Sequence, residues 1–147
     1  MVAVLLINGL LRSIPALGEL TDSHFGEATR YRVVYQFNRS DGGYHQSVLF
    51  SIGELVRKYG DDIEIVVVAM GPGLHILGHN PSRPVASDVK EKVQSLAAYG
   101  VAFKACGNTM ASLGWTPADL LDFSEVVPIG AEALIDMQAR GFAYLSW

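Results

Sequence analysis

The sequence predicts an α/β domain in which helices cover both faces of a mainly parallel, five-stranded sheet. Segments rich in β-branched and apolar residues alternate with segments of helical spacing from residue 31 to residue 145. Short connections join them, and such alternation is typical of right-handed strand–helix–strand crossovers. Residues 63–70 are almost entirely apolar, as in a central strand covered on both faces. These observations predict a three-layer sandwich.

The first half of the domain is expected to hold two strands and the helix between them. Residues 31–37 and 63–70 are rich in the β-branched, aromatic and apolar residues that favour strands. Between them, apolar residues recur at helical spacing and predict a helix over 44–59. Ser40 or Asp41 is expected to cap the N-terminus of this helix.

The second half continues the alternation. Ser87 or Asp88 is expected to cap a second long helix that ends near residue 99. The last helix is expected to bury Leu134, Ile135 and Ala139. The other expected elements are strands over 101–105, 125–129 and 142–145, short helices over 108–113 and 116–121, and a helix over 131–140.

Composition limits the classes of function. The chain has 147 residues, of which 50% are hydrophobic and 18% charged, and its mean hydropathy is +0.25. This low charge predicts that apolar surface is buried between subunits of a homo-oligomer. A net charge of −4 without a basic run argues against a nucleic-acid partner. No apolar stretch is long enough to span a bilayer.

Residues 1–29 differ from the rest of the chain and are expected to form an apolar arm and linker before a single domain at 30–147. The apolar run at 2–11 resembles the core of a secretion signal, and Ala16-Leu17-Gly18 resembles a cleavage site. However, no Lys or Arg precedes the run, so a retained arm is favoured over a degenerate signal segment. Together with the single cysteine, this predicts a cytoplasmic location; a functional signal would make it periplasmic.

Cys106 is the strongest candidate for chemistry. It is the single cysteine and follows the expected strand over 101–105, where a helix is about to begin. Backbone N–H groups and the helix dipole at such a position favour a thiolate over a thiol. The competing interpretation is a small buried apolar residue, because free cysteines are among the most buried residue types.

Three neighbours are expected to support the thiolate. Strand alternation places Lys104 on the same face as Cys106, where its charge would stabilise a thiolate. Asn108 or Thr109 is expected to cap the following helix and to orient its free N–H groups.

Other polar residues are expected at the same edge of the sheet. In parallel sheets, ligands collect at the carboxyl ends of the strands. Segments 38–43 and 71–73 follow the first two strands and should lie beside Cys106. The candidates to line this cleft are Asn38, Asp41, His45, Gly71, Gly73 and His75.

No metal or organic cofactor is expected. His75 and His79 are four residues apart, but Gly78 and Pro81 weaken any helix between them, and no third ligand is near. The loop that starts at Gly71 lacks the glycine pattern of a dinucleotide site and the Gly-Lys-Ser or Gly-Lys-Thr of a phosphate loop.

Four segments resemble a known family: residues 31–37, 65–71, 100–110, which contain Cys106, and 138–145. Together they resemble the DsrE/DsrF-like family, in particular its small stand-alone members. The resemblance implies a parallel five-stranded sheet and assembly into dimers, trimers or hexamers. It also implies sulfur relay through a cysteine persulfide, and the sulfur-carrying cysteine corresponds to Cys106.

Three functions therefore stay open. The first is a sulfurtransferase-like carrier that receives sulfur on Cys106 from a donor protein and passes it to an acceptor protein. The second is a non-catalytic, oligomeric binding module for a small anionic ligand or a partner, with Cys106 only lining the cleft. The third is a redox sensor that forms an intermolecular disulfide.

Overall fold

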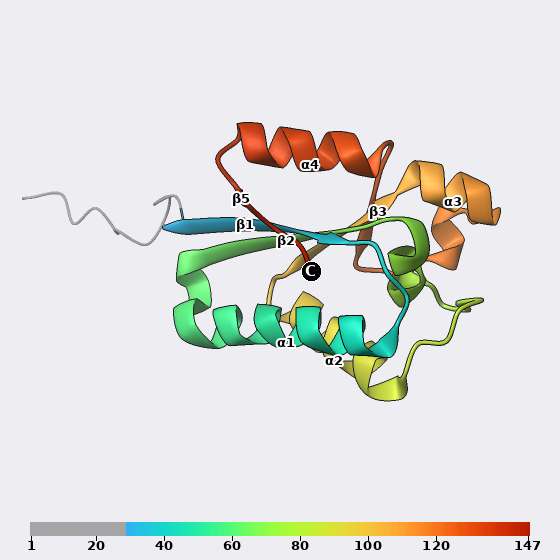
Figure 1. The fold of residues 1–147 in the computed structure, drawn as a ribbon, viewed down its shortest axis with the longest axis horizontal. Helices are drawn as coiled ribbons and strands as arrows, with labels where there is room; N and C mark the ends of the chain where they lie inside the picture. Colours follow the sequence, from blue (N-terminus) through green and yellow to red (C-terminus); the bar gives the residue numbers. More distant parts are fainter. Residues whose placement is uncertain (1–28) are drawn as a thin grey trace, which may run out of the picture.

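A computed structural model describes residues 29–147, and in it a parallel sheet of five strands has the order β4-β3-β2-β1-β5 (Figure 1). The strands are β1 (Tyr31–Phe37), β2 (Ile63–Ala69), β3 (Ala102–Cys106), β4 (Ser124–Val127) and β5 (Ala143–Leu145). The α-helices are α1 (Gly42–Tyr59), α2 (Ser87–Ala98), α3 (Gly107–Leu113) and α4 (Gly130–Ala139). Short 3-10 helices are η1 (Gly60–Asp62), η2 (Gly71–Leu77) and η3 (Pro117–Asp119). The predicted fold class is confirmed. The arm expected at the N-terminus lies outside the described residues.

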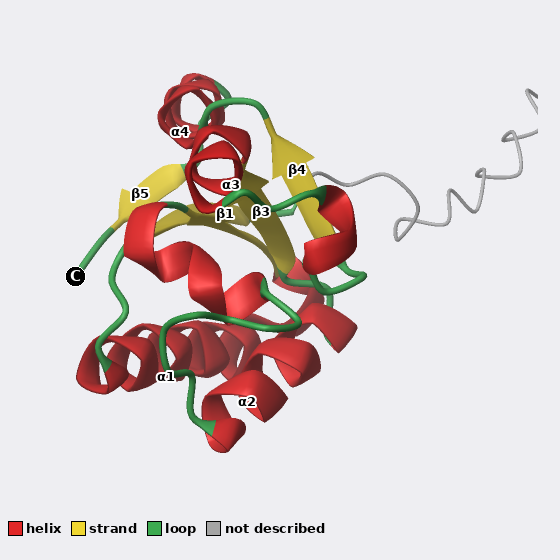
Figure 2. Cartoon of the chain, turned by 90° about the vertical axis from the view of Figure 1, so that its right-hand side faces the viewer, coloured by secondary structure: helices red, strands yellow, loops and turns green. Residues whose placement is uncertain are grey.

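The helices form two layers around the sheet. Helices α1 and α2 lie on one face and α4 lies on the other (Figures 1 and 2). From β1 to β4 the chain crosses the sheet in one direction, and α4 then leads back to β5 beside β1. Right-handed crossovers in opposite directions put their helices on opposite faces. This topology therefore accounts for the three layers.

Two apolar clusters fill the spaces between the layers. Tyr35 and Val67 belong to the cluster under α1 and α2, whereas the adjacent Val34 and Val66 belong to the cluster under α4. Because neighbouring strand residues point to opposite faces, β1 and β2 are buried on both sides. This explains why residues 63–70 are almost continuously apolar.

The capping predictions are partly correct. Asp41 caps α1, since its carboxylate accepts a 2.9 Å hydrogen bond from the amide of Tyr44. The predicted caps of α2 are wrong, because this helix begins at Ser87 and the residue at its N-cap is Ala86. The Asp88 carboxylate instead accepts a 2.6 Å hydrogen bond from Gln46 on α1. Contact between the two helices thus replaces a local cap.

The buried face of α4 also differs from the prediction. Ala133, Leu134 and Met137 are buried, but Ile135 is 67% exposed and Ala139 is exposed as well. Residues three and four apart share a helix face, whereas Ile135 is turned about 100° from Leu134. The prediction for Ile135 and Ala139 is therefore wrong, and this side of the molecule carries exposed apolar surface. Within residues 29–147, no helix is both long and apolar enough to cross a membrane.

Candidate functional site

Cys106 is the last residue of β3 and stands at the N-cap position of α3. Its side chain is only 3% exposed. Asn108 and Thr109 lie in the first turn of α3 and are not its cap, contrary to the prediction. The strand thus ends at the cysteine, and the next helix begins directly after it.

The sulfur accepts hydrogen bonds from segments on both sides of it. The amide of Gly130, the first residue of α4, donates to Sγ over 3.2 Å. Burial by itself raises the pKa of the Cys106 thiol, but hydrogen bonds from the side chain and amide of Thr109 and from the amides of Gly130 and Asn108 lower it more. The net result is a pKa below the usual value for cysteine, which favours the thiolate.

Glycine allows the Gly130 amide to approach the sulfur so closely. A Cβ atom at this position would lie 3.2 Å from Sγ and 3.1 Å from Cβ of Cys106. The pattern of the sequence does not single out Gly130, because it is 24 residues away and joins the site only through the pairing of β3 with β4. A glycine after the expected strand over 125–129 is the one signal that could have indicated it.

Thr109 connects the sulfur to the loop after β2. The amide of Gly71 donates a 2.9 Å hydrogen bond to Oγ1 of Thr109. Gly71 has a φ of +52°, and a Cβ on Gly73 would lie 2.2 Å from the carbonyl oxygen of Phe37. Both glycines therefore shape a tight turn that brings η2 against the carboxyl end of β1, and neither offers a functional side chain.

The structure gives Lys104 a different partner from the expected one. It shares the sulfur's side of the sheet, but its ammonium donates to the carboxylate of Glu125 on the neighbouring strand β4. Hydroxyl and amide donors, rather than the Lys104 charge, lower the pKa of Cys106.

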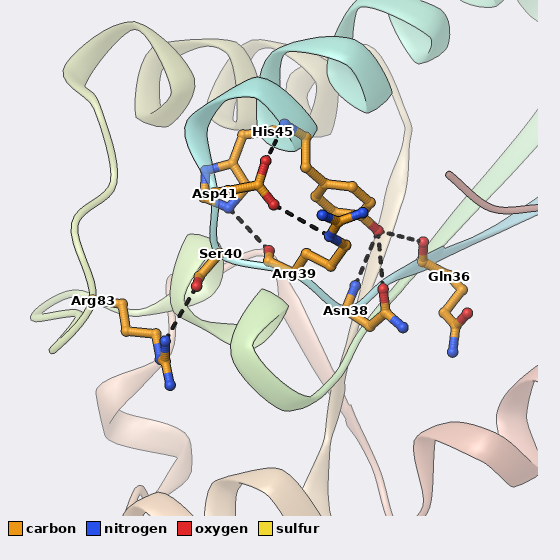
Figure 3. A network of polar contacts seen from close by, with 8 residues as sticks. Gln36, Asn38, Arg39, Ser40, Asp41, His45 and Arg83 are labelled. Carbon is orange, nitrogen blue, oxygen red and sulfur yellow. Dashed lines mark hydrogen bonds and ion pairs between the residues drawn. The ribbon is translucent and has the colours of Figure 1, made fainter.

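Asn38, Asp41 and His45 form a separate network at the end of β1 (Figure 3). The Tyr44 hydroxyl donates to the carbonyl of Gln36 over 3.0 Å and accepts from the amide of Asn38 over 3.1 Å. His45 is 1% exposed, and its Nε2 lies 3.1 Å from the carbonyl oxygen of Arg39. Burial lowers the pKa of His45 and keeps its ring neutral near pH 7. These side chains hold the turn between β1 and α1.

A cavity of about 330 Å³ opens on the other side of Thr109, between η2 and α3. His75 lines it and is 2% exposed, and its ring packs edge-on against Trp115. Among the described residues, Nδ1 of His75 has no hydrogen-bond partner. Burial, followed by the charge of Arg83, lowers the pKa of His75. Gly71, His75 and Thr109 therefore line one cavity, and Thr109 connects it to Cys106 through a hydrogen bond.

Metal ligands are not grouped in the described part of the chain. Over residues 29–147, no three or more His, Cys, Asp or Glu side chains come together in a way that could hold a metal ion.

Comparison with known proteins identifies the family. The model of the DsrE/DsrF-like family matches residues 32–147. A protein of unknown function from Methanobacterium thermoautotrophicum has a similar structure, with a TM-score of 0.71 and 27% identity over 80% of this chain and 99% of the other. The ychN protein from E. coli shares the fold, with a TM-score of 0.59 and 16% identity over 80% of this chain and 99% of the other. So does a conserved protein of unknown function from Bacteroides thetaiotaomicron, with a TM-score of 0.59 and 13% identity over 82% of this chain and 100% of the other. No curated protein matches the chain. Because the family model covers nearly all of the described residues, the chain belongs to the DsrE/DsrF-like family.

Proposed function

We propose that the protein relays sulfur as a persulfide on Cys106 and passes it to a partner protein. The observation that carries this proposal is the convergence of hydrogen-bond donors from α3 and α4 on the sulfur of Cys106, which lowers the pKa of the thiol. Family membership supports it, because the DsrE/DsrF-like family is associated with sulfur relay.

The chemistry consists of two thiol exchanges. The Cys106 thiolate attacks the outer sulfur of a donor persulfide, so that an S–S bond forms at Cys106 and the S–S bond of the donor breaks. The donor leaves as a thiol and keeps the proton of the persulfide. A thiolate on the acceptor protein then attacks the outer sulfur on Cys106, and the Cys106 thiolate leaves. The sulfur keeps its oxidation state throughout, and Thr109 and the Gly130 amide stabilise the anion before and after each exchange.

A second function is favoured by a different observation. Cys106 is 3% exposed, whereas the neighbouring cavity between η2 and α3 is open. In this second function the protein binds a small anionic ligand or a partner, and Cys106 lines the site without reacting.

Mass spectrometry of the intact protein distinguishes the two functions. After exposure to inorganic polysulfide, or to a cysteine desulfurase with cysteine, a sulfur carrier gains one or more sulfur atoms that a reductant removes. The gain maps to Cys106 and is absent from Cys106→Ser. If the wild-type protein gains no sulfur, or if Cys106→Ser gains as much, the binding module is the better description.

We also propose an oligomeric state, a location and a domain organisation for the protein. Proteins of this family are often oligomeric, and Val126, Ile129 and Ile135 are exposed apolar residues near β4 and α4. We propose a homo-oligomer of two, three or six subunits in the cytoplasm, in which residues 30–147 form the domain and the preceding residues an arm. Light scattering coupled to size-exclusion chromatography measures the subunit number, and a monomer at micromolar concentration would contradict this assembly.

A further inference from the structure

The cavity between η2 and α3 has the size of a site for a small organic molecule. Its volume is about 330 Å³, near the lower end of the range found for ligand sites, about 300–1,000 Å³. Polar groups of its wall come from separate parts of the chain: Gly71 and His75 on η2, Arg83 on the loop before α2, and Asn108, Thr109 and Ser112 on α3.

The charge of this cavity favours an anion. Among the described residues that line it, Arg83 alone carries a formal charge, and no carboxylate faces it. One guanidinium nitrogen of Arg83 donates to the hydroxyl of Ser40 over 3.3 Å, which anchors the side chain beside the cavity (Figure 3). The guanidinium has five N–H donors in a planar fork, so others stay available, and their geometry matches a carboxylate.

His75 is a second, independent sign of a ligand. It lines the cavity while almost fully buried, and its Nδ1 has no partner within the described part of the chain. Buried polar atoms are nearly always hydrogen-bonded, and an unpaired one needs an explanation. A polar ligand in the cavity supplies the missing partner, because a neutral imidazole offers one N–H donor and one acceptor.

Thr109 joins this cavity to the reactive sulfur. Its side chain lines the cavity, accepts from the Gly71 amide over 2.9 Å, and forms one of the hydrogen bonds that lower the pKa of Cys106. Thr109 is therefore the residue that the wall of the cavity and the hydrogen bonds of the sulfur have in common.

We propose that this cavity binds the carboxylate of a low-molecular-weight persulfide, R–S–SH, which is a direct sulfur donor to Cys106. This inference rests on the proposed sulfur-relay function and names the class of its donor. The Cys106 thiolate forms a bond to the outer sulfur, the S–S bond of R–S–SH breaks, and R–SH leaves with the proton. The carboxylate stays at Arg83 and His75 during the transfer and orients the donor.

Two donors that differ only in charge test the proposal. These are the persulfides of 3-mercaptopropionate and of its uncharged amide, 3-mercaptopropionamide, and the rate of sulfur gain on Cys106 is followed by mass spectrometry of the intact protein. We expect the carboxylate donor to load Cys106 about tenfold faster, as one charge-assisted hydrogen bond implies. Arg83→Gln should remove this preference, because it lowers the rate with the carboxylate donor to about the rate with the amide.

Two controls distinguish binding of the carboxylate at Arg83 from an effect of losing any surface arginine. Arg57→Gln also removes an exposed arginine, but from the groove between α1 and α2, and should preserve the preference. The unreactive thioether 3-(methylthio)propionate should slow loading from the carboxylate donor in the wild type but not in Arg83→Gln.

The outcomes distinguish a failure of the donor site from a failure of the sulfur-relay function. If inorganic polysulfide and both persulfides fail to load Cys106, the sulfur-relay function itself is overturned. If polysulfide loads Cys106 but both persulfides fail, react equally fast, or are slowed equally by Arg83→Gln, the donor site is overturned and the relay function stands.

Discussion

The carboxyl ends of β1 and β3 look alike in the sequence but differ in how their hydrogen bonds are made. After each strand, at the same edge of the sheet, the chain places polar residues within two positions and begins a helix within five. At the end of β1, Asp41 and His45 bond to the backbone of their own turn. At the end of β3, the sulfur of Cys106 collects donors from α3 and from the start of α4.

This difference separates a structural turn from a candidate site. Hydrogen bonds that close within one turn stabilise that turn and leave no group for a ligand. Donors that converge from two helices on one sulfur stabilise a charge, and an unpaired His75 and the Arg83 guanidinium lie around the adjoining cavity. The end of β1 is therefore expected to control stability, and the end of β3 to control reactivity.

Gly73→Ala should have the largest effect, because Gly73 packs against the end of β1. The added Cβ would lie 2.2 Å from the carbonyl oxygen of Phe37, so the backbone has to move. We expect the free energy of unfolding to fall by about 3 kcal/mol, measured by urea denaturation. The control is Gly53→Ala on α1, where a Cβ meets nothing within 4 Å and the helix should gain stability. Equal stability of the two variants would contradict the close approach of η2 to β1.

Thr109→Val tests the end of β3 by removing the hydroxyl beside the sulfur. The pKa of Cys106 should rise, since the Thr109 side chain is the strongest of the hydrogen bonds that lower it. The thiolate is the reactive form, so alkylation at pH 7 should slow about tenfold while the fold is retained. The measurement is the rate of iodoacetamide alkylation between pH 5 and pH 10, in which the midpoint of the thiolate curve moves to higher pH. Ser112→Ala, one turn later on α3, is the matched control and should leave the curve unchanged.

Asp41→Ala should show the opposite pattern. Loss of the α1 cap should lower the midpoint of thermal unfolding by about 3 °C without changing the alkylation rate of Cys106. The cap is an acceptor for the amide of Tyr44 and makes no hydrogen bond to the cysteine. Calorimetry and the same alkylation assay measure both properties. A change in alkylation with no change in melting would reverse the roles assigned to the two strand ends.

Gly130→Ala should have the smallest effect and tests the donor from α4. Its Cβ would lie 3.2 Å from Sγ, so the sulfur or the helix must shift by a few tenths of an ångström. The longer amide–sulfur hydrogen bond should raise the pKa of Cys106 and slow alkylation about threefold. Gly42→Ala is the matched control, since Gly42 is also the first residue of a helix and a Cβ there meets nothing within 4 Å. If both variants react like the wild type, the Gly130 amide does not stabilise the thiolate.

The sequence predicted what periodicity and local turns encode. The alternating strands and helices, the cap at Asp41 and the place of Cys106 at the end of a strand all depend on residues within a few positions of each other. Two of the predictions that failed involve contacts between elements. Asp88 lies within α2 and accepts from Gln46 of α1 instead of capping the helix, and Lys104 is paired with Glu125 of β4.

By itself, then, the sequence determined the fold class and the single thiol at the carboxyl edge of the sheet. Only the tertiary structure decided which groups surround that thiol. The order of the strands places β4 beside β3 and so brings Gly130 to the sulfur, and the fold of η2 against α3 brings Gly71 to Thr109 and buries His75 at the cavity. The physical reason is that the apolar periodicity of a helix or strand is a property of its own segment. The groups that surround the carboxyl end of a strand depend instead on how all the segments pack together.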